Sequence, residues 1–265
     1  MIAPMASTQV DGLRISYDDV GTGEPALLCL TGWCSSRARF EHLVPLLAEK
    51  RRVLAFDWRG HGDSERNGAD FVQADMVEDA LGVIEAAGVE HVVPVAASHS
   101  GWVAIELRRR LGAERVPKLV HMDWMVVEPS ERYMDVIRML QSDDTWSQAR
   151  DTLFTIWQAG TDRPDVRRVI DVMQEQSQEM WMRSGREIEA AYTRGTSPLK
   201  TYEREPAPAL HVYGQPQDPA YLEVQRAFAA EHPWFHVQTV PAQTHFAMVE
   251  TPREAAEAIE AFVVA

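Results

Sequence analysis

The chain has 265 residues, of which 45% are hydrophobic and 25% charged, and its formal net charge at pH 7 is −14. These proportions are typical of a soluble globular protein with one large domain, and the acidic excess argues against nucleic acid or an anionic membrane as a partner. No apolar stretch approaches the length of a membrane span, and no signal peptide is expected. Cys29 and Cys34 form neither a zinc pattern nor a disulfide framework, which favours a reducing cytoplasm.

Short apolar runs alternate with segments of helical periodicity over most of the chain. Residues 10–18, interrupted by Asp11-Gly12, are typical of an antiparallel hairpin. Continuous apolar runs predict buried strands at residues 26–30, 52–56, 91–97, 118–122, 209–213 and 235–240. Helices are expected at residues 40–47, 73–87, from 101, at 221–232 and from Thr251-Pro252. This alternation predicts an α/β fold, a mostly parallel sheet with helices on both faces.

One long segment interrupts the alternation. Between residues 129 and 198 there is no strand signal, only helical runs rich in Met and Trp, among them Trp157 and Trp181. We interpret residues 129–198 as a helical cap inserted into an α/β core, which residues 1–128 and 199–265 would form.

The stretch from Val95 to Trp102 is typical of a strand, a tight turn and a helix, with Ser98 at the tip. In the α/β-hydrolase fold a nucleophilic serine occupies such a turn, and small residues flank it because the backbones crowd there. The usual pattern is G-x-S-x-G, whereas Ala96 and Ser100 stand at the two glycine positions here. These five residues alone fit a nucleophile elbow and an ordinary strand-to-helix turn equally well.

The order of Ser98, an aspartate and His245 along the chain favours the elbow, because α/β-hydrolase triads have this order. His245 lies in a loop after the last predicted strand, at the sheet edge where parallel strands end and sites form. The backbone N–H groups of Trp33 and His99 would then be the two oxyanion donors. No group of side chains has zinc-ligand spacing, so no metal site is expected.

Two aspartates compete as the partner of His245. The usual position of the acid falls one residue before Asp218. Asp123 instead follows the strand after the elbow helix, a known alternative position for the acid. A buried strand end suits a carboxylate that pairs with an imidazole, and we therefore expect Asp123 to orient His245.

Several motifs together are more specific than the fold. They are Thr31-Gly-Trp-Cys34, Asp57-Trp-Arg-Gly-His-Gly62, Ser98-His99 with Gly101-Trp102, Met122-Asp123-Trp124, Trp181-x-Arg183-Ser-Gly-Arg186, His232-Pro-Trp-Phe235 and Thr244-His245-Phe246. In these runs, which span nearly the whole chain, the sequence resembles the cofactor-independent 2,4-dioxygenases that open 3-hydroxy-4(1H)-quinolone rings and release carbon monoxide. It departs from them at Ser35 and Ala97, where the best-known members carry histidines.

The resemblance implies an enzyme of the α/β-hydrolase fold without a cofactor, whose partners are a small aromatic substrate and dioxygen. An electron-rich substrate anion can itself reduce dioxygen, so the protein needs a base and a dry pocket. His245, oriented by Asp123, would remove the 3-hydroxyl proton. Ser98 and the N–H groups of Trp33 and His99 would hold the carbonyl oxygen. The pocket is expected to be lined by Ser35, Ala97, Trp124, Trp157 and Trp181.

Two other functions would use the same residues. An esterase or amidase would employ Ser98 as the nucleophile, and a non-catalytic ligand receptor would keep the pocket without needing the His–Asp pair. Carbon monoxide release in air without an acyl-enzyme distinguishes the dioxygenase from the hydrolase. The frequent Met side chains of the cap favour a 2-alkyl substituent longer than methyl, because they adapt to flexible apolar ligands.

Overall fold

Eight strands form one sheet in the computed structural model, which describes residues 5–195, 197–214 and 219–265. The strand order is β1-β2-β4-β3-β5-β6-β7-β8. The strands are β1 (Met5–Val10), β2 (Leu13–Val20), β3 (Ala26–Leu30), β4 (Val53–Phe56), β5 (Val92–Ala97), β6 (Leu119–Met122), β7 (Ala209–Tyr213) and β8 (Phe235–Thr239). Every strand predicted from an apolar run is confirmed.

The sheet is antiparallel at its first edge and parallel elsewhere. β1 pairs with β2 across the Asp11-Gly12 turn, where both residues have positive φ (51° and 79°), and β2 pairs antiparallel with β4. All later pairings are parallel. The five residues of β3 and the six of β5 are all buried, as expected for strands covered on both faces.

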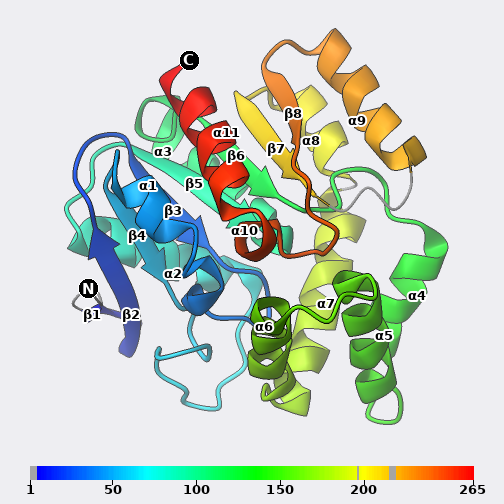
Figure 1. Cartoon of the computed structure of the whole chain (residues 1–265). Coiled ribbons are helices and arrows are strands. Elements are labelled where there is room, and N and C mark those ends of the chain that lie inside the picture. The colour runs from blue at the N-terminus through cyan, green and yellow to red at the C-terminus, as the bar shows by residue number, and fades with distance from the viewer. Residues whose placement is uncertain (1–4, 196, 215–218) are drawn as a thin grey trace.

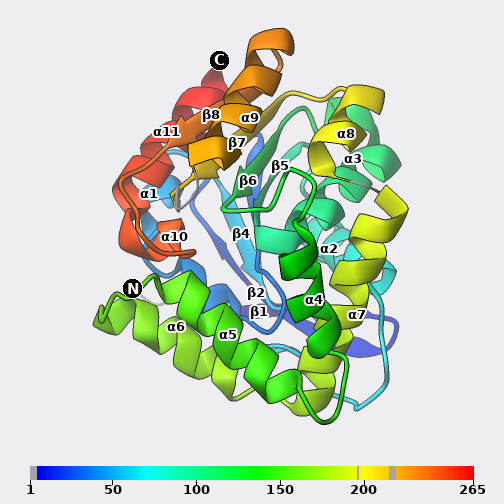
Figure 2. The ribbon, with the colours of Figure 1, turned by 90° about the vertical axis from the view of Figure 1, so that its right-hand side faces the viewer.

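Helices cover both faces of the sheet. α1 (Val44–Ala48) and α11 (Pro252–Val264) pack together on one face, and α2 (Gln73–Ala86) and α3 (Gly101–Arg115) pack on the other (Figures 1 and 2). α9 (Pro219–Glu231) lies against β8, and α10 (Ala247–Glu250) precedes α11. In the described part of the chain, no helix is long and apolar enough to cross a membrane.

A group of helices lies between β6 and β7 in the chain, beyond the carboxyl ends of the parallel strands (Figure 2). Within the range 129–198 it comprises α4 (Glu131–Met139), α5 (Trp146–Gln158), α6 (Pro164–Gln174) and α7 (Gln178–Gly195). The described residues of this range contain no strand, as predicted. α8 (Pro198–Arg204) returns to the sheet, where Tyr202 packs against His121 and Phe235.

One local prediction was wrong. A single helix was expected at 40–47, but the chain forms a 3₁₀ turn at Arg37–Phe40 and then the short α1, with Pro45 in its first turn. The prediction for the last helix is confirmed: Thr251 is its N-cap and Pro252 its first residue, and the Thr251 hydroxyl donates to the carbonyl of Ala247. α10 therefore connects directly to α11.

Replacing Gly101 by alanine should destabilise the protein. Gly101 has φ −54°, where alanine normally stabilises a helix by about 1 kcal/mol. A Cβ at this position would lie 2.3 Å from the Trp124 ring, and such overpacking costs about 1–3 kcal/mol. Urea denaturation of Gly101→Ala should show the loss, and Trp124→Leu in the same chain should recover part of it. A Gly101→Ala variant as stable as the parent would contradict this contact.

Candidate active site

Ser98 lies on a sharp turn between β5 and α3. Its φ is +56°, a conformation that non-glycine residues seldom adopt. Ser100, which replaces a glycine of the usual elbow pattern, donates its hydroxyl to the carbonyls of Leu30 (3.0 Å) and Ala97 (2.8 Å). These bonds tie the turn to the end of β3, so the Ser100 side chain contributes to holding the elbow.

The loop after β3 places Trp33 beside this turn. The N–H of Cys34 donates to Nε2 of His61 (3.1 Å), and Nδ1 of His61 lies 3.0 Å from the carbonyl of Arg59. His61 thus holds the loop after β3 against the loop that follows β4. The Trp33 ring stacks on Phe71, with centroids 5.6 Å apart and 14° between the planes.

A narrow cavity of about 30 Å³ brings these elements together. It lies between the ends of the parallel strands and the inserted helices. Six of the predicted site residues line it, namely Trp33, Ser98, His99, Trp157, Trp181 and His245. The remaining lining residues are Gly32, Arg39, Tyr133, Ile137, Leu140, Leu153, Met173, Ser184, Ile188 and Phe246.

Three residues expected in the pocket wall do not line this cavity. Ser35 and Ala97 are buried and do not contribute to its lining. Trp124 packs edge-on against Trp102, with ring centroids 5.1 Å apart, and against Gly101.

Asp123 lies at the end of β6 with φ +45° and is buried. Its carboxylate accepts hydrogen bonds from the N–H groups of Gly214 (2.7 Å) and Ala247 (3.3 Å). It therefore joins the end of β7 to the loop that carries His245. The competing Asp218 lies outside the described residues.

The His245 ring stacks on Trp157, with centroids 5.3 Å apart and 22° between the planes. The backbone N–H of His245 also donates to the Trp157 carbonyl (2.9 Å). Among the described residues, no hydrogen bond joins the His245 ring to the Asp123 carboxylate or to the Ser98 hydroxyl. The pairing of Asp123 with His245 stays a prediction.

Burial keeps both histidines of the cavity neutral, and a neighbouring cation adds to this effect at His245. Desolvation lowers the pKa of His245 from 6.5 to about 3, and the charge of Arg39 and the ring of His99 act in the same direction. Burial lowers the pKa of His99 to about 3, and its Nε2 lies 2.9 Å from the Tyr133 hydroxyl. At neutral pH both imidazoles can accept a proton.

Sequence reasoning missed Arg39 and Tyr133, because neither belongs to a motif that indicates the site. Asp57 directly follows β4, and its carboxylate accepts the N–H groups of Arg37 (2.7 Å) and Asp63 (3.0 Å). Asp57 therefore stabilises the loops around the cavity and does not line it.

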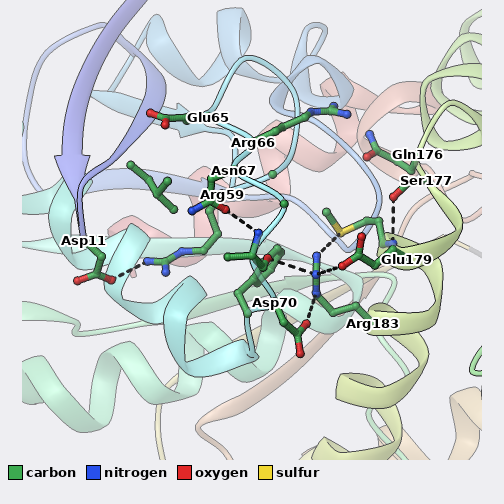
Figure 3. A pocket seen from close by; sticks show the side chains of 16 residues that line it. Asp11, Arg59, Glu65, Arg66, Asn67, Asp70, Gln176, Ser177, Glu179 and Arg183 are labelled. Carbon is green, nitrogen blue, oxygen red and sulfur yellow. Dashed lines mark hydrogen bonds and ion pairs between the residues drawn. The ribbon is translucent and has the colours of Figure 1, made fainter.

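A second cavity, of about 230 Å³, lies between the loop before α2 and the inserted helix α7 (Figure 3). Two of its arginines are paired: Arg183 contacts Asp70 (2.7 Å) and Glu179 (3.1 Å), and Arg59 contacts Asp11 (3.0 Å). The two cavities share no lining residue. The Arg183–Asp70 pair docks α7 onto the core.

Two known proteins with similar sequences belong to one enzyme family. The profile described as "Alpha/beta hydrolase family" matches residues 27–258. A 2-heptyl-3-hydroxy-4-quinolone dioxygenase of Rhodococcus erythropolis is 37% identical over 96% of both chains. A 1H-3-hydroxy-4-oxoquinoline 2,4-dioxygenase of Pseudomonas putida is 36% identical over 98% of this chain and all of its own.

Solved structures agree with the relatives. The structure of a 1H-3-hydroxy-4-oxoquinoline 2,4-dioxygenase superposes with a TM-score of 0.93 at 35% identity, covering 98% of this chain and all of that one. A structure described as an AqdC variant that cleaves the Pseudomonas quinolone signal, in complex with its substrate, superposes with a TM-score of 0.91 at 32% identity and the same coverage.

The lowered pKa of His245 predicts a specific pH dependence of stability. Below pH 6.5 the unfolded chain binds a proton at this position that the folded chain does not bind until about pH 3. The free energy of unfolding therefore falls as the pH is lowered through this window. His245→Gln should reduce the slope of the unfolding free energy against pH by about 1.4 kcal/mol per pH unit between about pH 6 and 4, which is the contribution of one bound proton. Denaturation at several pH values, with His42→Gln as the surface control, measures it; an unchanged slope would contradict the burial of His245.

Proposed function

We infer that this chain, which belongs to the 3-hydroxy-4-quinolone 2,4-dioxygenases within the α/β-hydrolase family, cleaves the ring of a 2-alkyl-3-hydroxy-4(1H)-quinolone with dioxygen. The products are carbon monoxide and an N-acylanthranilate. We assign the reaction to the narrow cavity because Ser98, Trp33 and His245 line it together with aromatic side chains of the inserted helices. In this proposal residues 129–198 are the cap, and residues 1–128 and 199–265 are the core.

The first step is removal of the 3-hydroxyl proton by His245. Its neutral imidazole can accept the proton, and its position on the cavity wall supports this role. The ring would turn from its stack on Trp157 so that one nitrogen faces the substrate and the other faces Asp123. Asp123 is bonded to the N–H of Ala247, two residues after His245, which supports this pairing.

The second step is the reaction of the substrate anion with dioxygen. The anion donates an electron to dioxygen, and the two radicals combine to form a peroxide at C2. The peroxide attacks the C4 carbonyl carbon, and the bridged ring breaks to expel C3 and its oxygen as carbon monoxide. One atom of dioxygen stays on the acyl carbon and the other on the new carboxylate. The N–H groups of Trp33 and His99, with Ser98, would stabilise the oxygen on C4.

The cavity walls support this chemistry because most of them are apolar or aromatic, which limits quenching of the anion by water. About 30 Å³ holds one or two water molecules, and a bicyclic ring is several times larger. Binding must therefore displace side chains, and the Met173 and Ile188 side chains from the cap line this wall. An alkyl substituent longer than methyl would lie among them.

An assay with and without oxygen tests the proposed function. With 2-heptyl-3-hydroxy-4(1H)-quinolone as substrate, carbon monoxide and N-octanoylanthranilate should form in air and neither should form under nitrogen. Labelling with ¹⁸O₂ should place both labelled atoms in the acylanthranilate. Unlabelled product, or turnover that continues without oxygen, would contradict the proposal and favour a hydrolase.

Replacing Ser98 should cost far less activity than replacing His245. In a serine hydrolase, loss of the nucleophile lowers turnover on the order of 10⁶-fold. In the proposed reaction Ser98 contributes one hydrogen bond, so Ser98→Ala should lower kcat about tenfold or less. His245→Ala removes the base and should cost about 10²–10⁴-fold. Steady-state rates of the two variants on the quinolone decide the ranking, and an acyl-enzyme on Ser98 detected by mass spectrometry would contradict it.

Asp123→Asn should lower kcat on the order of 10²–10⁴-fold, because an amide favours the wrong imidazole tautomer. The asparagine oxygen can still accept one of the two N–H groups that Asp123 holds, so the fold should persist. Asp218→Asn is the matched comparison, with circular dichroism to check folding. A larger loss in Asp218→Asn than in Asp123→Asn would make Asp218 the partner of His245.

A further inference from the structure

A buried cation lies in the wall of the active-site cavity. Arg39 is only 3% exposed and lines the cavity with Ser98 and His245. A Cβ placed on Gly32 would lie 3.1 Å from Nη1 of Arg39 and 3.4 Å from Cβ of Ser98. The guanidinium and the elbow serine therefore lie on the same side of the Gly32 backbone, where the substrate oxygens are proposed to bind.

The guanidinium has few partners for a group at this depth. It carries five N–H donors, and Nε has no hydrogen-bond partner in the part of the chain that the structure describes. Nη2 lies 3.8 Å from the Met248 sulfur, a weak acceptor, and Cζ lies 5.4 Å from the centre of the Phe246 ring. Burying a charge without strong acceptors costs free energy. The protein bears this cost in the wall of the active-site cavity.

No carboxylate of the described residues forms an ion pair with Arg39. Asp123 acts on it through its charge, but the Asp123 carboxylate is held by the N–H groups of Gly214 and Ala247. The other titratable groups around the cavity are His99, Tyr133 and His245. Burial lowers the pKa of Arg39 to about 10, so the side chain is positively charged at neutral pH.

We propose that Arg39 binds the anionic form of the quinolone substrate, so that the cation favours loss of the 3-hydroxyl proton inside the cavity. This inference rests on the proposed function. The negative charge of the anion spreads over the oxygens at C3 and C4, and a planar guanidinium can donate two parallel N–H groups to adjacent oxygens. The free Nε–H is the donor that such a contact would use.

This role also resolves a chemical difficulty at His245. A base whose conjugate acid is destabilised by burial and by a neighbouring cation is weak. The cation that weakens His245 also stabilises the product of the proton transfer, because an opposite charge within about 4–6 Å lowers the pKa of an acid by roughly 1–3 units. The substrate therefore ionises mainly because Arg39 stabilises the anion, and a strong base at His245 is not needed.

An anaerobic titration separates ionisation from the reaction with oxygen. The bound quinolone and its anion differ in absorbance, so the fraction ionised in the complex can be followed against pH. Wild type should hold the anion at pH values where the free ligand is neutral. Arg39→Met should raise the apparent pKa of the bound ligand by about one to two units, and Arg39→Lys should recover part of that shift. In air, kcat/KM of Arg39→Met below its new pKa should fall about 10- to 100-fold.

Arg115→Met is the matched control. Arg115 donates to the carbonyls of Val89 and Glu90, before the start of β5 and therefore at the sheet edge opposite the cavity. Its loss removes one positive charge far from the ligand and should leave the titration unchanged. If Arg39→Met does not fold, Arg39→Gln carries the same test.

The outcomes distinguish the role of Arg39 from the proposed function of the protein. Equal ionisation of the bound ligand in wild type and in the uncharged Arg39 variants would overturn the role of Arg39 and leave the proposed function intact. An equal shift in Arg115→Met would overturn it as well, because the effect would then come from net charge. A wild-type protein that binds no quinolone would contradict the proposed function itself.

Discussion

The Asp123 carboxylate is the contact on which the arrangement of this site depends. It accepts one N–H from Gly214 after β7 and another from Ala247, the first residue of α10, and it is buried. Two backbone donors without this acceptor would be unsatisfied in the interior, at about 1–3 kcal/mol each. Asp123 thus sets the position of the His245 loop relative to the sheet, whether or not its charge also reaches the His245 ring.

The site is also built on strained backbone. Cys34, Ser98 and Asp123 have φ values of 59°, 56° and 45°, and they follow three strands that are neighbours in the sheet, β3, β5 and β6. Such conformations cost of order 1–3 kcal/mol each and persist only where the surroundings impose them. Here the surroundings are identified: His61 bonds to the N–H of Cys34, Ser100 bonds across the elbow, and Asp123 bonds to two loops.

Most of the sheet and the positions of Ser98 and His245 could be predicted, because strand periodicity and chain order are local or linear signals. The sequence was a poorer guide to which side chains face the cavity. Trp124 follows Asp123 directly and was expected in the pocket, but it packs against Gly101 on the other side of the strand end. Arg39 looks like part of a charged surface turn in sequence. Only the fold shows that Arg37 pairs with Asp57 while Arg39 is enclosed.

Helix α7 has two functions on two faces. Trp181, Ser184 and Ile188 line the active-site cavity. Two residues between them along the chain face the core instead. Arg183 forms an ion pair with Asp70, and its guanidinium lies 4.3 Å from the centre of the Phe71 ring. Glu187 accepts the N–H of Gln73 at 2.9 Å. A shift of α7 would therefore change the docking of the cap and the shape of the cavity together. Ile137 of α4 and Leu153 of α5 also reach the cavity, and these two helices contact the core at the site itself, through the Tyr133 hydroxyl at His99 and the Trp157 carbonyl at the N–H of His245.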